Sequence, residues 1–265
     1  MTLRSDERLD ARLACIPYAK ERPRASAPSA STSADDTAWW FWATGADSAP
    51  PLVQRCLSTV RQTLGEDRVT VLDEQNYRDH VRLPPHIESL HETVGWTHFS
   101  DLLRLHLLAE HGGSWIDATV MLSAPPPPEI AGSDFFAFTR PEDPFLMSSW
   151  FLRASAGDPL VIVWRDLLVR YWADNSELRD YFLMHFMFET AVTAYPALRE
   201  EWLRVPVHSF EPAHRVQAVL GEPAGSVDLQ SLLSQSWIHK LTYKLPVESF
   251  AEGTVAAALV DGVSP

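Results

Sequence analysis

The sequence predicts an α/β fold in which helices flank a mixed, mainly parallel sheet and the second half of the chain is largely helical. First, residues 38–43 form a dense aromatic run without polar alternation, which is typical of a buried central strand. Second, residues 51–64 carry apolar side chains at helical spacing, and residues 68–73 form another short strand. Third, residues 99–111 show a helical pattern that ends at two glycines before a further strand at 114–117. A strand, a helix and a strand in this order favour parallel pairing.

The first helix has a defined start and a consistent apolar face. Pro50 and Pro51 open it, because proline is tolerated at the first positions of a helix. With the strands before and after it, this helix forms a unit with the right-handed crossover expected between parallel strands. Its apolar positions are Leu52, Val53, Cys56, Leu57, Val60 and Leu64.

The segment 99–119 is the most informative part of the chain. Its leucines give a broad apolar helix face, and the glycine pair at 112–113 fits a left-handed helix end. Arg104 lies about 12 Å before these glycines along a helix, and Asp117 lies about 13 Å after them along a strand. If the chain reverses direction at the glycines, Asp101, Arg104 and Asp117 come to the same level. One cation and two carboxylates would then meet at the mouth of a sheet.

Proline and helix signals organise the rest of the chain. Four consecutive prolines at 125–128 make an extended break, and residues 135–139 follow as a strand. Asp158 is expected to cap a helix that runs to about residue 173, and residues 178–195 form another helix. We find no internal repeat and no break that demands two domains. Less regular helical patterns occur at 213–220, 229–235 and 247–259.

Composition is that of a globular protein, which we expect in the cytoplasm. The chain has 265 residues and 46% hydrophobic content. We divide it into an N-terminal extension at 1–36, expected to be flexible with a short helix within residues 1–20, and a single domain at 37–265. The formal charge of −13 without a basic patch argues against nucleic-acid binding. No 18-residue apolar stretch and no apolar signal core occur. Cys15 and Cys56 suggest a reducing compartment, although pairing between them stays open.

Four segments carry motifs in a defined order and spacing. They are WWFWATG at 39–45, SDLLRLHLLAEHGGSWIDAT at 100–119, DYFLMH at 180–185 and IHKLTYK at 238–244. Together they resemble the capsular polysaccharide synthesis protein family over roughly residues 38–245. The second and fourth motifs are specific, whereas the two aromatic motifs are weak alone. The resemblance relates the chain to glycosyltransferases that carry a sugar-binding Asp-x-Asp region, among them mannosyltransferase-like enzymes and glucosylating toxins.

This resemblance implies a GT-A-like nucleotide-sugar-binding fold and a reaction class. We expect transfer of a hexose from a UDP- or GDP-sugar to a hydroxyl of a glycan or lipid-linked acceptor, with retention of the anomeric configuration. The implied cofactor is Mn²⁺ or Mg²⁺. A lipid-linked acceptor is compatible with peripheral association at the inner face of the membrane.

Asp117 is the first candidate for catalysis and for metal binding. Relatives present two aspartates one residue apart at this strand end, whereas here the second position is Thr119, a far weaker metal ligand. By resemblance, Asp117, Thr119 and His239 would hold the divalent cation, which stabilises charge on the leaving diphosphate. The alternative for Thr119 is an ordinary β-branched strand residue.

Asp101 and Arg104 complete the candidate catalytic group. By resemblance they bind the donor sugar and its phosphates beside Asp117. A guanidinium holds phosphates or hydroxyls with its planar fork, and the free N–H groups of a helix start favour anions. The alternative is a surface helix with an i,i+3 ion pair and a solvated aspartate at a strand end.

Other residues are predicted to bind the donor. Trp40 and Trp42 lie on the first strand, where relatives stack the base, and Trp42 is nearer the carboxyl end at which ligands bind. One face of that strand must be core. Asp73 either contacts ribose or base or initiates a turn. Lys240 and Lys244 would neutralise the diphosphate, although one of the two is expected to be only solvated.

Ser149 is expected to approach the sugar. Tyr181, His185 and Glu189 share one helix face, which fits core packing better than an acceptor site or a metal pair. Because Thr119 replaces an aspartate, a non-catalytic nucleotide-sugar-binding scaffold stays an alternative to the enzyme, as does a nucleotide-sugar hydrolase.

Overall fold

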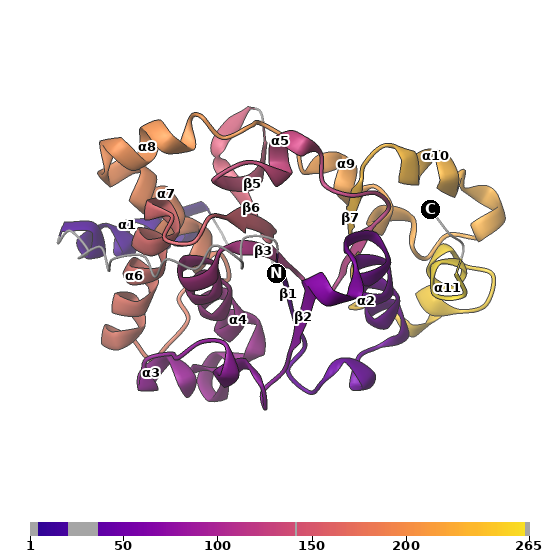
Figure 1. Cartoon of the computed structure of the whole chain (residues 1–265), viewed down its shortest axis with the longest axis horizontal. Coiled ribbons are helices and arrows are strands. Elements are labelled where there is room, and N and C mark those ends of the chain that lie inside the picture. Colours follow the sequence, from indigo (N-terminus) through magenta and orange to yellow (C-terminus); the bar gives the residue numbers. More distant parts are fainter. Residues whose placement is uncertain (1–4, 21–36, 141, 263–265) are drawn as a thin grey trace.

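The core of the protein is a five-stranded mixed sheet (Figure 1). The computed structural model describes residues 5–20, 37–140 and 142–262. The strands of this sheet are β1 (Ala38–Phe41), β2 (Val69–Leu72), β3 (Gly113–Ile116), β5 (Phe135–Arg140) and β6 (Asp143–Ala154), and a separate pair contains β4 (Val120–Leu122) and β7 (Ile238–Lys240). The order is β2-β1-β3-β6-β5, with β1 parallel to β2 and β3, and β6 antiparallel to β3 and β5. Strand β6 is therefore the one strand of this sheet that is antiparallel to the others, which confirms the predicted mixed, mainly parallel sheet.

Helices cover both faces of this sheet. The α-helices are α1 (Ser5–Cys15), α2 (Pro51–Leu64), α3 (Pro85–Glu88), α4 (Leu90–His111), α5 (Pro128–Ala131), α6 (Pro159–Asp174), α7 (Leu183–Ala194), α8 (Pro196–Trp202), α9 (Glu211–His214), α10 (Leu229–Ser234) and α11 (Val255–Val260). Helices α4, α6 and α7 lie on one side and α2 on the other (Figure 1). Among the described helices none is long and apolar enough to cross a bilayer. Short 3₁₀ turns occur at 16–20, 46–48, 66–68, 77–79, 217–219, 224–226 and 247–250.

Alternation along β1 divides the core into two clusters. Trp39 and Phe41 pack on the face that α4 covers, whereas Trp40 packs on the opposite face with Val53 and Leu57 of α2. Successive side chains of a strand point to opposite faces, which explains the division. The predicted central position of this strand is confirmed, because it pairs on both sides and all four of its residues are buried.

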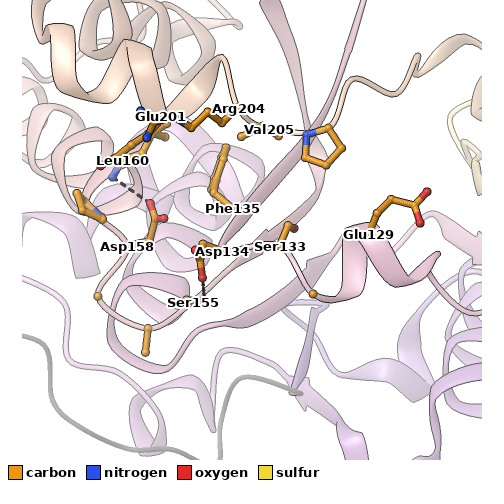
Figure 2. Close-up of a pocket in the computed structure, with 15 residues that line it drawn as sticks. Glu129, Ser133, Asp134, Phe135, Ser155, Asp158, Leu160, Glu201, Arg204 and Val205 are labelled. Atoms are coloured by element: carbon orange, nitrogen blue, oxygen red, sulfur yellow. Dashed lines mark hydrogen bonds between the residues drawn. The ribbon is translucent and has the colours of Figure 1, made fainter.

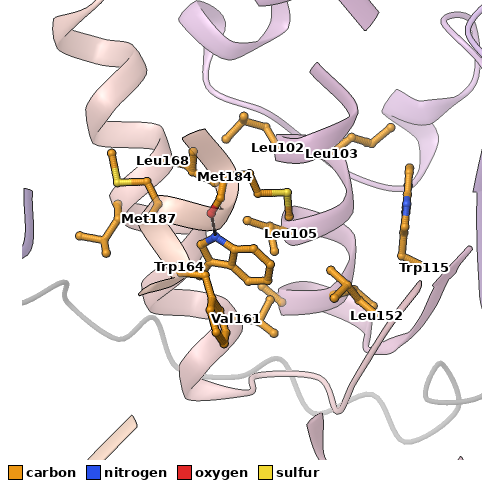
Figure 3. Close-up of a cluster of buried hydrophobic side chains, with 14 of the residues drawn as sticks. Leu102, Leu103, Leu105, Trp115, Leu152, Val161, Trp164, Leu168, Met184 and Met187 are labelled. Atoms are coloured by element: carbon orange, nitrogen blue, oxygen red, sulfur yellow. Dashed lines mark hydrogen bonds between the residues drawn. The ribbon is translucent and has the colours of Figure 1, made fainter. Parts of the chain in front are cut away.

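The larger cluster fills the space between the sheet and helices α4, α6 and α7 (Figure 3). Leu105 of α4 and Trp164 of α6 are both fully buried in it. The indole N–H of Trp164 donates to the carbonyl of Met184 at 2.7 Å, so the polar atom of this buried ring is paired. Buried apolar surface contributes about 25 cal/mol per Å². This packing holds α4 firmly against the sheet.

Glycines set both the bend and the end of α4. Gly95 has a φ of 80° inside the helix and divides it into two segments. The predicted helix at 99–111 is the second of these segments. At its end Gly112 and Gly113 have φ values of 68° and 91°, which side chains other than glycine rarely adopt. They turn the chain directly into β3, as the sequence predicted.

The second half confirms the predicted helix cap and adds a strand. The carboxylate of Asp158 accepts hydrogen bonds from the N–H groups of Leu160 and Val161 and so caps α6. Strand β6 was not predicted. It pairs with β3 in the register Ile116 to Phe151 and forms a hairpin with β5. Its place in the sheet depends on these two neighbours rather than on a local signal.

Residues before the predicted domain boundary at 37 take part in the packing. Helix α1 lies against α7, where Arg12 pairs with Glu189 at 2.8 Å. The hydroxyl of Tyr195 donates to the carbonyl of Ala19 at 2.8 Å. The remainder of the predicted flexible extension, residues 1–4 and 21–36, lies outside the described residues. The packed domain thus includes part of the segment that was assigned to the extension.

Both cysteines are free thiols. Cys15 and Cys56 are fully buried in different clusters and do not pair. Burial raises the pKa of each thiol to about 12, so neither is a thiolate at neutral pH. The pairing that the sequence left open is therefore absent.

Candidate functional site

Three parallel strands end at one edge of the sheet, and a predicted site residue follows each of them. Trp42 follows β1, Asp73 follows β2 and Asp117 follows β3. The N–H of Trp42 donates to the carbonyl of Leu72 at 3.0 Å, and the N–H of Asp117 donates to that of Trp150 at 2.9 Å. Ligands of open α/β sheets bind beyond the carboxyl ends of the strands. This edge is therefore the candidate site.

Arg104 is a buried cation that connects α4 with the end of β3 and with the middle of β6. Only 4% of its side chain is exposed, and its Nη2 lies 3.0 Å from the Asp101 carboxylate and 3.6 Å from that of Asp117. The guanidinium also donates to the backbone carbonyls of Ser100 and Ser149. The structure thus brings Asp101, Arg104 and Asp117 together at the level that the sequence predicted. Ser149 reaches this group through its backbone.

The Asp117 carboxylate is surrounded by donors. Its Oδ1 accepts from the indole N–H of Trp115 at 2.9 Å, and its Oδ2 accepts from Lys240 at 2.9 Å. The same indole lies under Arg104, with 4.9 Å between the guanidinium carbon and the ring centre. Burial would raise the pKa of Asp117, but the Lys240 and Arg104 charges outweigh it and lower that pKa. Asp117 is therefore ionised at neutral pH.

Lys240 reaches the site from the far end of the chain. Strand β7 pairs antiparallel with β4, and the register sets Lys240 opposite Val120. The ammonium consequently lies beside the segment that follows β3, where it donates to Thr119 Oγ1 at 2.6 Å as well as to Asp117. Lys240 therefore bridges the two residues of the Asp-x-Thr motif.

The two tryptophans predicted to stack on a base have different surroundings. Trp42 is half-buried at the site edge, and its ring centre lies 5.4 Å from that of Tyr243. Trp40 is fully buried beneath α2 and cannot contact a ligand at this edge, which corrects its prediction. Lys244 is exposed, with its ammonium 5.8 Å from the centre of the Tyr243 ring. Trp42 and Tyr243 therefore form an aromatic pair at this edge of the sheet.

Asp73 makes the contacts of a turn-initiating residue. Its Oδ1 accepts from the N–H of Gln75 at 2.8 Å and from that of Asn76 at 3.0 Å. These bonds match the turn-initiating role, which the sequence left as the alternative to contact with ribose or base. The residue nevertheless lies at the same edge as Trp42, next to Gly45. Both of these hydrogen bonds are accepted by the same carboxylate oxygen, Oδ1.

His239 is not brought to Asp117. It is fully buried on β7, and its Nε2 lies 3.1 Å from the hydroxyl of Ser123. Because neighbouring residues of a strand point to opposite faces, His239 faces away from the side of β7 on which Lys240 meets Asp117. Burial lowers the pKa of His239 to about 4, so the ring is neutral at pH 7. The predicted sharing of a metal between His239 and Asp117 is corrected accordingly.

The remaining predicted metal ligands do not fit a divalent ion as they are arranged. Asp117 Oδ2 and Thr119 Oγ1 both accept from the Lys240 ammonium. Mn²⁺ and Mg²⁺ require several oxygen ligands, which the ammonium would have to vacate. Over the described ranges 5–20, 37–140 and 142–262, no group of three His, Cys, Asp or Glu side chains is placed to hold a metal. The use of Mn²⁺ or Mg²⁺ stays a prediction from the resemblance.

Three residues lie next to the group of Asp101, Arg104 and Asp117, although the sequence did not assign them to the site. His98 lies 3.4 Å from the Asp101 carboxylate, and its ring contacts that of Tyr181 at 5.3 Å. Tyr181 is 58% exposed. Burial lowers the pKa of His185 to about 4, although the nearby Asp101 charge opposes the shift. The sequence predicted one helix over 178–195 and favoured core packing for Tyr181 and His185 on it. Helix α7 begins only at Leu183, so Tyr181 lies in the turn before the helix and does not share a helix face with His185.

A cavity lies at the opposite edge of the sheet (Figure 2). Its volume is about 670 Å³, and Asp134, Asp158 and Glu201 line it. Asp134 precedes β5, so the cavity adjoins the amino edge of β3 rather than its carboxyl edge. Burial raises the pKa of Asp158 to about 6. Its largely acidic lining disfavours an anionic ligand, so the carboxyl edge remains the candidate site.

Two curated proteins resemble part of the chain. The O-glycosyltransferase PaGT of Phomopsis amygdali is 25% identical over 167 residues, which cover 55% of this chain and 41% of PaGT. The O-glycosyltransferase braB of Annulohypoxylon truncatum is 30% identical over 174 residues, which cover 56% of this chain and 40% of braB. The matched region thus spans about two fifths of each relative. Among solved structures, the PaToxG glycosyltransferase aligns with a TM-score of 0.46 and 12% identity over 98% of this chain and 95% of its own.

A family model covers nearly the whole chain. The model described as capsular polysaccharide synthesis protein matches residues 18–259. This range includes β1, the Asp101, Arg104 and Asp117 group, and the segment that carries Lys240. It also begins at Tyr18, before the boundary at 37 that the sequence predicted. The chain belongs to the capsular polysaccharide synthesis protein family.

Proposed function

We propose that this protein is a glycosyltransferase that moves a hexose from a nucleoside-diphosphate sugar to a hydroxyl of a glycan or other acceptor, with retention of configuration. The observation that carries the proposal is the cluster of Asp101, Arg104, Asp117 and Lys240 beyond the carboxyl ends of β1, β2 and β3. Family membership and the names of the two O-glycosyltransferase relatives support it.

The charges of this cluster suit the departure of a diphosphate. Lys240 and Arg104 are fixed cations whose geometry is set by carboxylates, so they need little reorganisation when negative charge develops on the leaving group. The carboxylates of Asp101 and Asp117 can accept hydrogen bonds from sugar hydroxyls. Trp42 and Tyr243 lie beside the edge where a base would stack. We assign no protein nucleophile or base. In the proposed retaining reaction the acceptor hydroxyl attacks the sugar on the face from which the diphosphate leaves, and the departing phosphate takes the hydroxyl proton.

The acceptor and the place of action belong to the same proposal. A glycan or a lipid-linked acceptor would approach past Tyr181 and Phe182, which are exposed next to Asp101 and its partner His98. Aromatic side chains of this kind supply apolar faces for sugar rings. We place the reaction in the cytoplasm, with the protein peripheral to the membrane when its acceptor is lipid-linked.

Turnover of a donor panel tests the proposal. Purified protein is incubated with UDP- and GDP-sugars, with and without glycan acceptors, and nucleotide release is followed. We expect release that an acceptor accelerates and that Asp117→Asn lowers by roughly 10²-fold or more. Tight nucleotide binding without turnover under every condition would contradict the proposal and favour the scaffold. Rapid release with water that acceptors do not change would favour a hydrolase.

A further inference from the structure

Lys240 lies where a divalent cation would have to bind between the two residues of the Asp-x-Thr motif. Its ammonium is 2.9 Å from Asp117 Oδ2 and 2.6 Å from Thr119 Oγ1. The pairing of Val120 with Lys240 in β4 and β7 holds it there through the backbone. A metal at this point would have to displace an ammonium that the sheet itself positions.

The charges balance without a metal. Two aspartates and one divalent ion sum to zero, whereas Asp117 with Thr119 carries a single negative charge that one ammonium neutralises. The loss of a carboxylate at position 119 and the presence of a lysine at 240 therefore compensate each other. The second carboxylate of the cluster, Asp101, is already paired with Arg104 at 3.0 Å.

The ammonium also retains capacity for a ligand. Lysine has three N–H donors, and the two contacts with Asp117 and Thr119 leave one of them available. One fifth of the Lys240 side chain is exposed. A phosphate oxygen can therefore meet the remaining donor without loss of the existing bonds. Lysine acts as a point charge on phosphate and needs no ligand sphere of its own.

We propose that Lys240 takes the place of a divalent cation in this protein, so that the diphosphate of the donor is bound and neutralised without a metal ion. This inference rests on the proposed function for the identity of the ligand. The claim about Lys240 itself concerns the exclusion of the cation from Asp117, which is measurable without any nucleotide.

Electron paramagnetic resonance of Mn²⁺ tests that exclusion directly. Wild-type protein and the double variant Thr119→Asp with Lys240→Ala are titrated with Mn²⁺ alone and then with UDP or GDP present. With Mn²⁺ alone, we expect the wild type to leave the signal of free Mn²⁺ unchanged. With UDP or GDP present, we expect the signal to fall only by the amount that the same nucleotide removes in buffer without protein. The double variant, which restores two aspartates and removes the ammonium, is expected to bind Mn²⁺. Adding Asp117→Asn to the double variant should abolish that binding.

A calorimetric titration of UDP and GDP into wild-type protein complements this result and does not depend on the folding of any variant. We expect dissociation constants in EDTA and in Mn²⁺ that agree within about twofold, because the ammonium supplies the charge on the phosphate. Affinity that Mn²⁺ raises roughly tenfold or more, or Mn²⁺ binding to wild type that Asp117→Asn removes, would overturn the inference. Failure to bind any nucleotide would instead refute the proposed function, while the Mn²⁺ titration would still decide the role of Lys240.

Discussion

The ammonium of Lys240 lies 2.9 Å from a carboxylate oxygen of Asp117, although 123 residues separate the two in the sequence. The pair differs from an exposed ion pair, which contributes about 0 to 1 kcal/mol, because three quarters or more of each side chain is buried. Loss of either partner leaves a charge that water solvates poorly. The pair therefore determines both the charge of the site and part of its stability.

Asp117→Asn should reduce both activity and stability. The neutral amide leaves Lys240 and Arg104 without their shared carboxylate. We expect turnover to fall by roughly 10²-fold or more and the free energy of unfolding to fall by about 3 kcal/mol. Nucleotide release and urea unfolding measure the two effects. Asp79→Asn, which changes an exposed carboxylate outside the site, is the control. Unchanged turnover in Asp117→Asn would exclude this carboxylate from the reaction.

Arg104→Lys should fail to replace the arginine, although the charge is kept. The guanidinium contacts Asp101 and Asp117 and donates to two backbone carbonyls, and a lysine cannot reach all of these at once. We expect the free energy of unfolding to fall by about 2 kcal/mol or more. Thermal unfolding checks this against Arg82→Lys at an exposed position. If the two variants were equally stable, the hydrogen bonds and ion pairs of the Arg104 guanidinium would contribute nothing to the free energy of unfolding.

Variants of Trp40 and Trp42, two of the three tryptophans in the WWFW run, should separate the effect on nucleotide binding from the effect on stability. Trp40→Ala empties a buried site and should lower the free energy of unfolding by about 3 to 5 kcal/mol. Trp42→Ala removes a half-buried ring at the site edge and should weaken nucleotide binding by roughly tenfold, with a smaller effect on stability. Calorimetric titration and urea unfolding of both variants check the pair. A stronger loss of binding in a folded Trp40→Ala than in Trp42→Ala would reverse the assignment of Trp40 to the core and of Trp42 to the site.

His239 should make the protein sensitive to acid. Its pKa falls from 6.5 to about 4 on folding, so between these values the unfolded chain binds more protons than the folded one. The free energy of unfolding should therefore drop as the pH falls from 6.5 toward 4, by on the order of 3 kcal/mol for this residue. His239→Gln has no ring to protonate and should flatten that part of the curve relative to wild type. If the free energy of unfolding of the two proteins changed equally with pH, burial would not shift the pKa of His239.

The part of the site that is local in sequence was predictable. Asp101, Arg104 and Asp117 lie within one helix, one glycine turn and one strand, so the rise per residue of each element fixes their common level. The first strand, the first helix and the cap of α6 were predictable for the same reason. Each has a start or stop signal within a few residues.

The rest depends on pairings between distant segments. Lys240 meets Asp117 only because β7 pairs with β4, and no local pattern states that register. The same register turns His239 away from the site, which is why its predicted role as a ligand was corrected. Trp40 and Trp42 carry equivalent side chains, and their separation into core and site depends on where β1 ends. Tyr181 lies in the turn before α7 and meets His98 of α4, a contact that spacing in the sequence does not reveal.

Binding of a nucleoside diphosphate to wild-type protein and to Lys240→Met tests the central claim most directly, because methionine keeps the apolar stem of the side chain and removes its charge. Calorimetric titration of UDP and GDP, with both proteins shown to be folded by circular dichroism, gives the two dissociation constants. The account predicts that wild type binds at least one of these nucleotides and that Lys240→Met binds it roughly tenfold or more weakly. Equal affinity of the two proteins, or no binding to the wild type, would contradict it.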